Sequence, residues 1–150
     1  MRLTQLRSKE VNKLIEAYGI SFNKNDSVQL QEDEHKLILV NKKPQFFYYK
    51  GKIVPTLQLL QQKLVLKKII IDIGAIKFVI NGADVMRPGI TEIEDGIEKG
   101  DFIVIIDQNN SKALSVGIAL LDTAEIRAAT NGKIIKNIHF IGDEIWKKWL

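Results

Sequence analysis

The sequence contains no cysteine. This absence excludes disulfide bonds, thiolate nucleophiles and the zinc sites that are built on cysteine. Histidine is scarce as well, because His35 and His139 are the two in the chain and they lie far apart. We therefore expect neither a metal nor a cofactor.

Long apolar runs are also lacking. No stretch approaches the roughly 20 apolar residues that a membrane-spanning helix needs. The first residues, MRLTQLRSKEV, lack the apolar core of a signal peptide. We expect no membrane partner and a cytoplasmic location.

Common catalytic motifs are missing too. The patterns GxxxxGK, GxGxxG, HExxH and GxSxG do not occur in the chain. The carboxylates have no histidine or second acid at a spacing that one helix or strand would turn into a site. These absences favour a protein that is not an enzyme.

What is present is ordinary globular material. The chain has 150 residues, of which 45% are hydrophobic and 27% are charged, which suits one medium domain or two small ones. The net charge is +4, but the positive charge lies in the first half. Lys and Arg outnumber Asp and Glu by 13 to 6 up to Lys68, and are outnumbered 9 to 12 from Ile69 onward. A polyanionic partner is compatible with this balance.

The first half reads as an α+β unit. Residues 8–19, SKEVNKLIEAYG, place Val11, Leu14, Ile15 and Tyr18 at helical spacing, with Ser8 as an N-cap and Gly19 as a stop. Strands are expected over 36–40 and 45–49. A short helix is expected over 56–62, with the Thr56 side chain as its N-cap.

The FFYY segment, residues 46–49, combines aromatic side chains with nearby lysines, which is typical of a surface that binds single-stranded RNA. Strand alternation favours a structural role instead, because Phe46 and Tyr48 share one face and Phe47 and Tyr49 share the other. We expect one pair to be buried and the second to pack on the C-terminal half.

The second half reads as a small barrel of short strands. The segments IIIDI, DFIVIID, KALSVGIALL and KIIKNIHFI are separated by turn-rich stretches. Two short helices are expected, one over residues 74–82 that ends at Gly82 and one over 143–150 that is capped by Asp143. The prediction is an α+β fold with an N-terminal domain over 1–66, a barrel domain over 67–150, and packing between the two halves.

One stretch, NGADVMRPGI at residues 81–90, has an unusual backbone. Gly82 can adopt the left-handed conformation, and Arg87, Pro88 and Gly89 can form a tight turn, with an extended segment between. Such a loop is expected to present main-chain N–H groups to a phosphate or sugar. The alternative is that its glycines and proline merely shape a connection.

The wider context resembles the PUA domain, named for pseudouridine synthases and archaeosine transglycosylases. The resemblance is carried by IDIGAIKFVINGADVMRPGI, GDFIVII, SVGIALL and NGKIIKNIHFIGDEIW. With VPTLQLL just ahead, the chain resembles the archaeal and eukaryotic malignant T-cell amplified sequence family, which joins a small N-terminal domain to a PUA domain. The resemblance implies a translation factor at the small ribosomal subunit, near the acceptor end of initiator tRNA, with a density-regulated partner.

The resemblance also implies which residues contact RNA. In PUA domains this surface is formed by the short helix, the glycine-containing loop and a strand near the C-terminus. These elements correspond to Lys77, Asn81, Gly82, Ala83, Asp84, Met86, Arg87, Lys133, Lys136, Asn137 and His139. Arg87 offers a forked cation for a phosphate or base edge, and Lys77 offers a point charge.

Several of these residues have structural alternatives. Asp84 also suits a turn cap, Met86 a core position, and His139 a contact that fastens the C-terminal helix to the barrel. At least one of Trp146 and Trp149 should be packed. The acidic run TEIEDGIEKGD, residues 91–101, would repel phosphate and should limit the RNA footprint.

The leading hypothesis is a non-catalytic RNA-binding protein that binds tRNA or ribosomal RNA in translation initiation. Two alternatives stay open. One is an adaptor whose basic half docks on a partner protein, and the other is an accessory subunit of an RNA-modifying enzyme.

Overall fold

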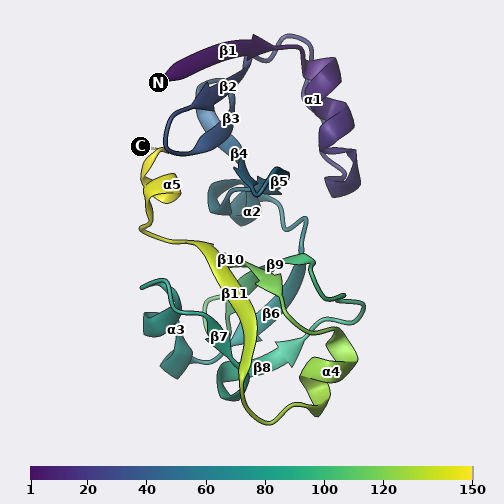
Figure 1. The fold of residues 1–150 in the computed structure, drawn as a ribbon, viewed down its shortest axis with the longest axis vertical. Helices are drawn as coiled ribbons and strands as arrows, with labels where there is room; N and C mark the ends of the chain where they lie inside the picture. Colours follow the sequence, from purple (N-terminus) through teal and green to yellow (C-terminus); the bar gives the residue numbers. More distant parts are fainter. Residues whose placement is uncertain (150) are drawn as a thin grey trace.

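The computed structural model describes residues 1–149, whose strands form two sheets stacked along the long axis (Figure 1). The N-terminal sheet is antiparallel throughout, in the order β1-β2-β3-β4-β5. Its strands are β1 (Arg2–Leu6), β2 (Val28–Glu32), β3 (Lys36–Val40), β4 (Lys43–Tyr49) and β5 (Lys52–Pro55).

Helix α1 (Ser8–Leu14) and the 3-10 turn η1 (Glu16–Tyr18) cover one face of this sheet. Val11 and Ile15 are buried against it, and Gly19 ends the turn with a φ of 70°. Two expectations were wrong. Arg7, rather than Ser8, occupies the N-cap and makes no side-chain capping bond, and Leu14 is 56% exposed because the apolar face is narrower than the spacing suggested.

The opposite face of the sheet packs on the C-terminal half. Phe46 joins the cluster under α1, whereas Phe47 joins a cluster that contains residues of the second sheet. This confirms the structural interpretation of FFYY. Helix α2 (Leu57–Gln62) lies in the same interface, and Thr56 caps it by accepting the N–H of Leu59 at 3.4 Å, as the sequence predicted.

The second sheet has the order β7-β11-β10-β9-β6-β8, in which β6 runs parallel to β9 and the other pairs are antiparallel. It curls around a core of its own. Its strands are β6 (Lys67–Ile71), β7 (Val85–Met86), β8 (Ile90–Ile93), β9 (Phe102–Asp107), β10 (Ala113–Ala119) and β11 (Lys133–Phe140).

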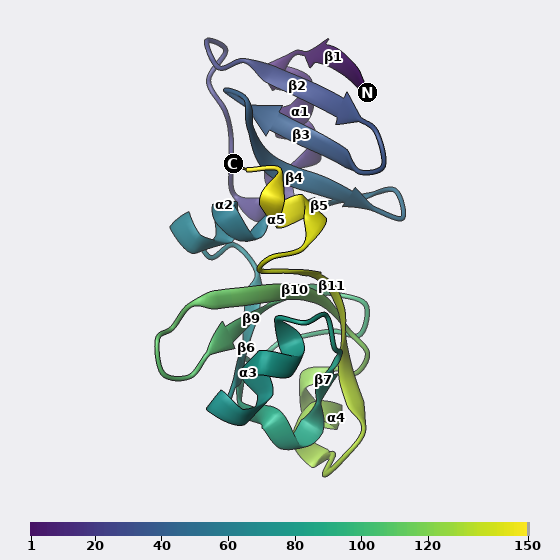
Figure 2. The ribbon, with the colours of Figure 1, turned by 90° about the vertical axis from the view of Figure 1, so that its left-hand side faces the viewer.

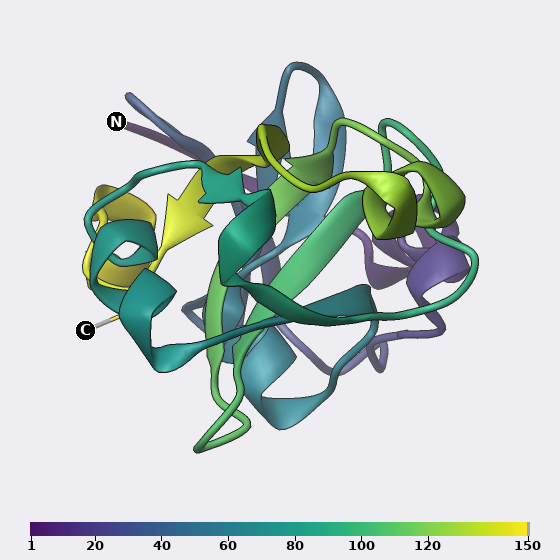
Figure 3. The same ribbon diagram turned by 90° about the horizontal axis from the view of Figure 1, so that it is seen from below.

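Helices flank the curled sheet. Figure 3, seen from below, shows α3 (Ile73–Val79) and α4 (Thr123–Ala128) at opposite sides of it. The short turn η2 (Arg87–Gly89) joins β7 to β8, and α5 (Glu144–Lys147) follows β11 and returns to the N-terminal sheet. The α+β fold is confirmed, and α4 is a helix that the sequence interpretation missed. Within residues 1–149 no helix is long and apolar enough to span a membrane.

The two halves share one continuous core. Leu37, Phe47 and Leu57 from the N-terminal half pack with Val104 and Val116 from the second sheet, and each of these side chains is at most 2% exposed. The halves therefore form a joint hydrophobic interior, as the small size of each predicted. This interior fixes the orientation of β11 and α3 relative to the N-terminal sheet.

Candidate nucleic-acid interface

Helix α3 is held at both ends by the segment that follows it. Asp72 caps its start by accepting the N–H of Ala75 at 3.0 Å, and the Asp72 N–H donates to the Gly89 carbonyl at 2.9 Å. At the other end Gly82 has a φ of 92°, the left-handed conformation that was expected. The helix and residues 82–89 therefore form one rigid hairpin-like unit.

Two glycines of this unit are required by close packing. A Cβ atom on Gly89 would lie 2.8 Å from the Ala75 Cβ, and one on Gly82 would lie 3.1 Å from the ring of Phe140. Glycine allows the loop to approach both α3 and β11 at these points. The expectation that the glycines shape the backbone is thus confirmed.

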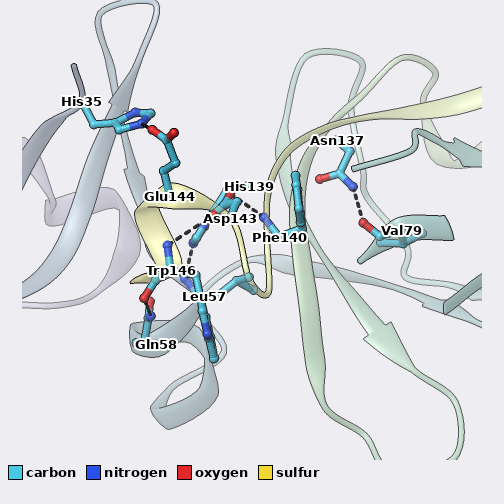
Figure 4. A network of polar contacts seen from close by, with 10 residues as sticks. All are labelled: His35, Leu57, Gln58, Val79, Asn137, His139, Phe140, Asp143, Glu144 and Trp146. Carbon is cyan, nitrogen blue, oxygen red and sulfur yellow. Dashed lines mark hydrogen bonds and ion pairs between the residues drawn. The ribbon is translucent and has the colours of Figure 1, made fainter. Parts of the chain in front are cut away.

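Asn137 of β11 clamps the unit in place. Its Nδ2 donates to the carbonyls of Val79, at 2.9 Å (Figure 4), and Ala83, at 3.0 Å. Its main-chain N–H donates to Asp84 Oδ1 at 2.8 Å. The Asn137 Nδ2 is therefore committed to the loop backbone and positions the loop, whereas the Asn137 Oδ1 is buried and has no hydrogen-bond partner among residues 1–149.

Between α3 and residues 83–89 lies a groove of about 640 Å³. Its walls are mainly apolar, and two of the wall residues are strongly exposed: Phe78 at 58% and Met86 at 48%. Met86 is thus not a core residue. The groove is lined by Asp72, Gly74, Ala75, Phe78, Val79, Ala83, Asp84, Val85, Met86, Pro88, Gly89 and Lys133.

Cations border the groove. Lys133 lies 2.9 Å from Asp84 as an ion pair, and Lys77 places its ammonium group 5.2 Å from the centre of the Phe78 ring. Burial raises the pKa of the Asp84 carboxyl. The Lys133 contact, the Asn137 N–H and the charge of Lys136 outweigh that effect, so the pKa falls below its usual value. Lys136 itself is exposed.

The expected main-chain donors are already used. The N–H groups of Asn81 and Ala83 donate to the Phe78 carbonyl, at 3.2 and 3.0 Å, and that of Gly82 donates to Val79 at 3.0 Å. These bonds satisfy the last carbonyls of α3, so the N–H groups of Asn81, Gly82 and Ala83 do not face a ligand. This expectation was wrong. Aromatic and aliphatic side chains, with lysines at the border, form the groove instead.

His139 was a candidate RNA contact, and the structure contradicts this. The side chain has no exposed surface. Its Nε2 accepts the main-chain N–H of Leu57 at 3.1 Å, and its Nδ1 lies 2.9 Å from Asp143 Oδ2 (Figure 4). Asp143 in turn caps α5 by accepting the N–H of Trp146 at 2.8 Å. His139 therefore fastens α5 and α2 to the barrel, which was the alternative interpretation.

Arg87 is also directed away from the groove. Its Nε donates to the Ile126 carbonyl at 2.8 Å and its Nη1 to the Ile90 carbonyl at 3.3 Å. The side chain lines a different hollow, together with Arg127 and two acidic residues of the run 91–101. Its observed role is to tie η2 to the end of α4, so it does not join the groove residues.

Of the predicted contacts, Ala83, Asp84, Met86 and Lys133 line the groove, and Lys77 lies beside it. Asn81 is exposed but its Nδ2 donates to the Lys77 carbonyl at 2.8 Å. Phe78 was missed. Its signal was present, because Phe78 lies off the apolar face that Ile76 and Val79 define, and an aromatic side chain on the solvent side of a helix has no packing role there. Among residues 1–149, no group of three or more His, Asp or Glu side chains could hold a metal ion.

Comparison with known proteins places both halves of the chain in known families of domains. Residues 67–141 match the PUA domain, and residues 5–63 match a domain of unknown function (DUF1947). An uncharacterized protein of Methanocaldococcus jannaschii is 40% identical, with 94% of this chain and 93% of that protein covered. The malignant T-cell-amplified sequence 1 homolog of Drosophila melanogaster is 33% identical, with 90% and 82% covered. Translation machinery-associated protein 20 of Saccharomyces cerevisiae is 34% identical, with 77% and 67% covered.

Solved structures share the whole fold. A hypothetical protein of Pyrococcus horikoshii superposes with a TM-score of 0.85 at 30% identity, covering 99% of this chain and 100% of that one. A conserved PUA domain protein of Thermoplasma acidophilum gives 0.83 at 27% identity, with the same coverage. An H/ACA RNP bound to a substrate RNA matches over 64% of this chain and 29% of that one, with a TM-score of 0.52 and 25% identity. Because two relatives exceed 30% identity over at least 82% of their own length, the chain belongs to the PUA-domain family that includes malignant T-cell-amplified sequence proteins and translation machinery-associated protein 20.

Proposed function

We propose that this protein is a non-catalytic RNA-binding factor of translation initiation, acting in the cytoplasm on tRNA or ribosomal RNA at the small ribosomal subunit. The groove between α3 and residues 83–89 is the observation that supports this most directly. Its exposed Phe78 and Met86 offer apolar surface to unstacked bases, and Lys77, Lys133 and Lys136 offer charge to phosphates.

The family names support the translation role, and the similarity to part of an H/ACA RNP, which is bound to a substrate RNA, supports RNA as the ligand. As part of the same proposal, residues 1–66 and 67–150 are the two domains. The N-terminal domain, which carries the excess of positive charge, contributes to RNA attraction or to docking of a density-regulated-type partner.

The direct test is binding of tRNA and of a single-stranded RNA oligonucleotide by fluorescence anisotropy. Replacing Phe78 by Ala should weaken binding by about 1 to 3 kcal/mol, because stacking of a base on an aromatic side chain contributes that much binding free energy. The exposed Leu64, replaced by Ala, is the control, since it lies outside the groove. Equal affinity of the Phe78 variant and the wild type would remove the groove from the RNA site.

Charge is tested separately. Replacing Lys133 by Gln should lower the slope of log affinity against log salt by about 1, because one phosphate contact and its released counterion are lost. Lys99, exposed in the acidic run, is the matched control. Replacing Lys99 by Gln should leave the slope unchanged.

A further inference from the structure

A second hollow, on the N-terminal half, concentrates positive charge. It measures about 440 Å³ and lies between α1 and the segment around Phe22. Asn12 holds these two parts together, because its Nδ2 donates to the Phe22 carbonyl at 2.9 Å and its Oδ1 accepts the Phe22 N–H at 2.8 Å. The hollow is therefore a built feature of the fold and does not depend on a loose loop.

Three lysines surround this hollow: Lys9 and Lys13 on α1, and Lys24 on the facing segment. All three are exposed, and no ion pair in the described part of the chain, residues 1–149, includes any of them. Glu16 is the acid in the lining. Lys9 and Lys13 lie one helical turn apart and repel one another, and Glu10 and Glu16, each three residues from Lys13, partly offset that repulsion.

The nearby acid on the facing segment is already occupied. Asp26 accepts the Asn23 N–H at 2.9 Å and the Asn41 Nδ2 at 3.0 Å, which fixes the turn beside Lys24. Its carboxylate is therefore held by the turn, and among residues 1–149 it makes no ion pair with the three lysines. Lys9 and Lys13 stand about 6 Å apart along the helix axis, so one strand of phosphates can meet both.

This hollow and the groove face opposite sides of the molecule. Figure 1 shows α1 on the right and α3 on the left, and Figure 2 shows α3 facing the viewer while α1 lies behind the N-terminal sheet. Because α1 and α3 lie on opposite sides, we do not expect one short strand of RNA to occupy both the groove and the hollow. A ligand at the hollow is therefore a second segment of RNA or a second molecule.

We propose that Lys9, Lys13 and Lys24 form a second RNA surface, which takes the phosphate backbone of a structured RNA while the groove holds an unpaired segment on the other face. The proposal rests on the protein being an RNA-binding factor, but it does not require the groove to be the first site. RNA is favoured over an acidic protein because protein interfaces centre on apolar and aromatic anchors. Six of the seven residues that line the hollow are polar or charged, and the one aromatic ring among them, Phe22, is partly buried against Phe46.

The experiment uses two RNA probes and the full-length protein. One probe is an RNA stem-loop with a blocked 3′ end, and the other is a single-stranded oligonucleotide. The test variant replaces Lys9, Lys13 and Lys24 by Gln, which retains helix propensity. The control variant removes the same charge elsewhere, by replacing Lys52, Lys99 and Lys112 by Gln; these lysines are exposed.

The test variant should reduce the salt slope for the stem-loop by about 3, one unit for each lost phosphate contact, whereas the control should retain it. Both proteins should bind the oligonucleotide as the wild type does. Each probe should also bind in the presence of a saturating amount of the other. A Phe78→Ala variant separates the two proposals, because it should weaken the oligonucleotide alone.

Four results would overturn the proposal. The stem-loop could bind the test variant as tightly as it binds the wild type. It could instead lose equal affinity for the test and control variants, which would indicate a diffuse charge effect. The two probes could displace one another, which would mean one site. The lysine variant could also retain its affinity for the stem-loop but lose its affinity for a purified acidic partner protein. That result would assign the lysines to protein docking. If instead Phe78→Ala has no effect on the oligonucleotide while the lysine variant weakens the stem-loop, the groove proposal fails and this one stands.

Discussion

Single residues decide which parts of the C-terminal segment border the groove and which hold the two halves together. On β11, Asn137 binds the groove loop and His139, two positions later, binds the interface between the halves. Residues two apart on a regular strand share a face, so the sequence predicted that Asn137 and His139 would lie on the same surface. The bulge at Ile138, where Val116 pairs with His139 and Gly117 with Asn137, separates their directions. No local pattern in the sequence announces that bulge.

His139 is predicted to matter for stability. Replacing it by Ala leaves the buried N–H of Leu57 and the carboxylate of Asp143 short of a partner and opens a cavity, which should lower the free energy of unfolding by about 2 to 4 kcal/mol. His35 is the matched control. It pairs with Glu144 at 2.9 Å on the surface, so His35→Ala should cost less than about 1 kcal/mol. Urea unfolding measures both, and similar losses for the two variants would contradict the account.

Asp143 makes the stability depend on pH. Burial raises the pKa of its carboxyl, but hydrogen bonds from His139, Trp146 and Phe140 favour the ionised form more strongly, so the pKa lies below its usual value. A carboxyl whose pKa is lower in the folded state stabilises at pH above its unfolded pKa, and this contribution is lost as the pH falls through the folded pKa. The difference in unfolding free energy between wild type and Asp143→Asn should therefore be constant near neutral pH and shrink below about pH 4. A difference that does not change with acidification would exclude this role.

Secondary elements with strong patterns were predicted, and polar or edge elements were not. Strand β2, VQLQE, lies next to the edge strand of its sheet, and most of its residues are half-buried. Its sequence is therefore largely polar and lacks a clear strand pattern. Helix α4 was missed although its start carries a capping box, in which Asp122 accepts the Glu125 N–H and Glu125 accepts the Asp122 N–H. The segment with the glycine motif does line the groove. Its chemistry was misjudged because a sequence does not show that the N–H groups of 81–83 close the end of α3.

The bulge in β11 can be tested through Gly117. An added Cβ there would collide with the Ile135 side chain and lie 2.8 Å from the Lys136 carbonyl oxygen. Gly117→Ala should therefore destabilise the protein by about 1 to 3 kcal/mol, as overpacking does. Gly74 in α3 is the opposite case, because an added Cβ meets Asp72 Oδ1 at an ordinary 3.5 Å. Gly74→Ala should stabilise by about 0.5 to 1 kcal/mol through helix propensity. Thermal melts measure the direction of both changes in stability. A lower melting temperature for both variants would contradict the prediction for Gly74→Ala.

The whole molecule behaves as one folding unit in this account. The core that joins Phe47 and Leu57 to Val104 and Val116 crosses from one half to the other, so neither half can expose it without loss of stability. Urea unfolding followed by tryptophan fluorescence and by far-UV circular dichroism should give one coincident transition. Two separated transitions would mean that the halves unfold independently.

The charge of the molecule is divided by face as well as by sequence. The apolar groove with its lysines lies on one side and the three lysines of the α1 hollow lie on the other. A third hollow, beside Arg87, is lined by both basic and acidic side chains. The charge asymmetry of the sequence predicted the positive N-terminal half. The charge asymmetry could not predict the position of the hollow. Lys24 lies next to α1 because the Asn12–Phe22 hydrogen bonds hold its segment against that helix.

The central claim is that RNA binds between α3 and residues 83–89. Titration of isotopically labelled protein with a single-stranded RNA, followed by amide chemical shifts, tests it most directly. The account predicts that the largest shifts fall in residues 73–89 and 133–137. Largest shifts in the acidic run 91–101, with none in α3, would contradict it.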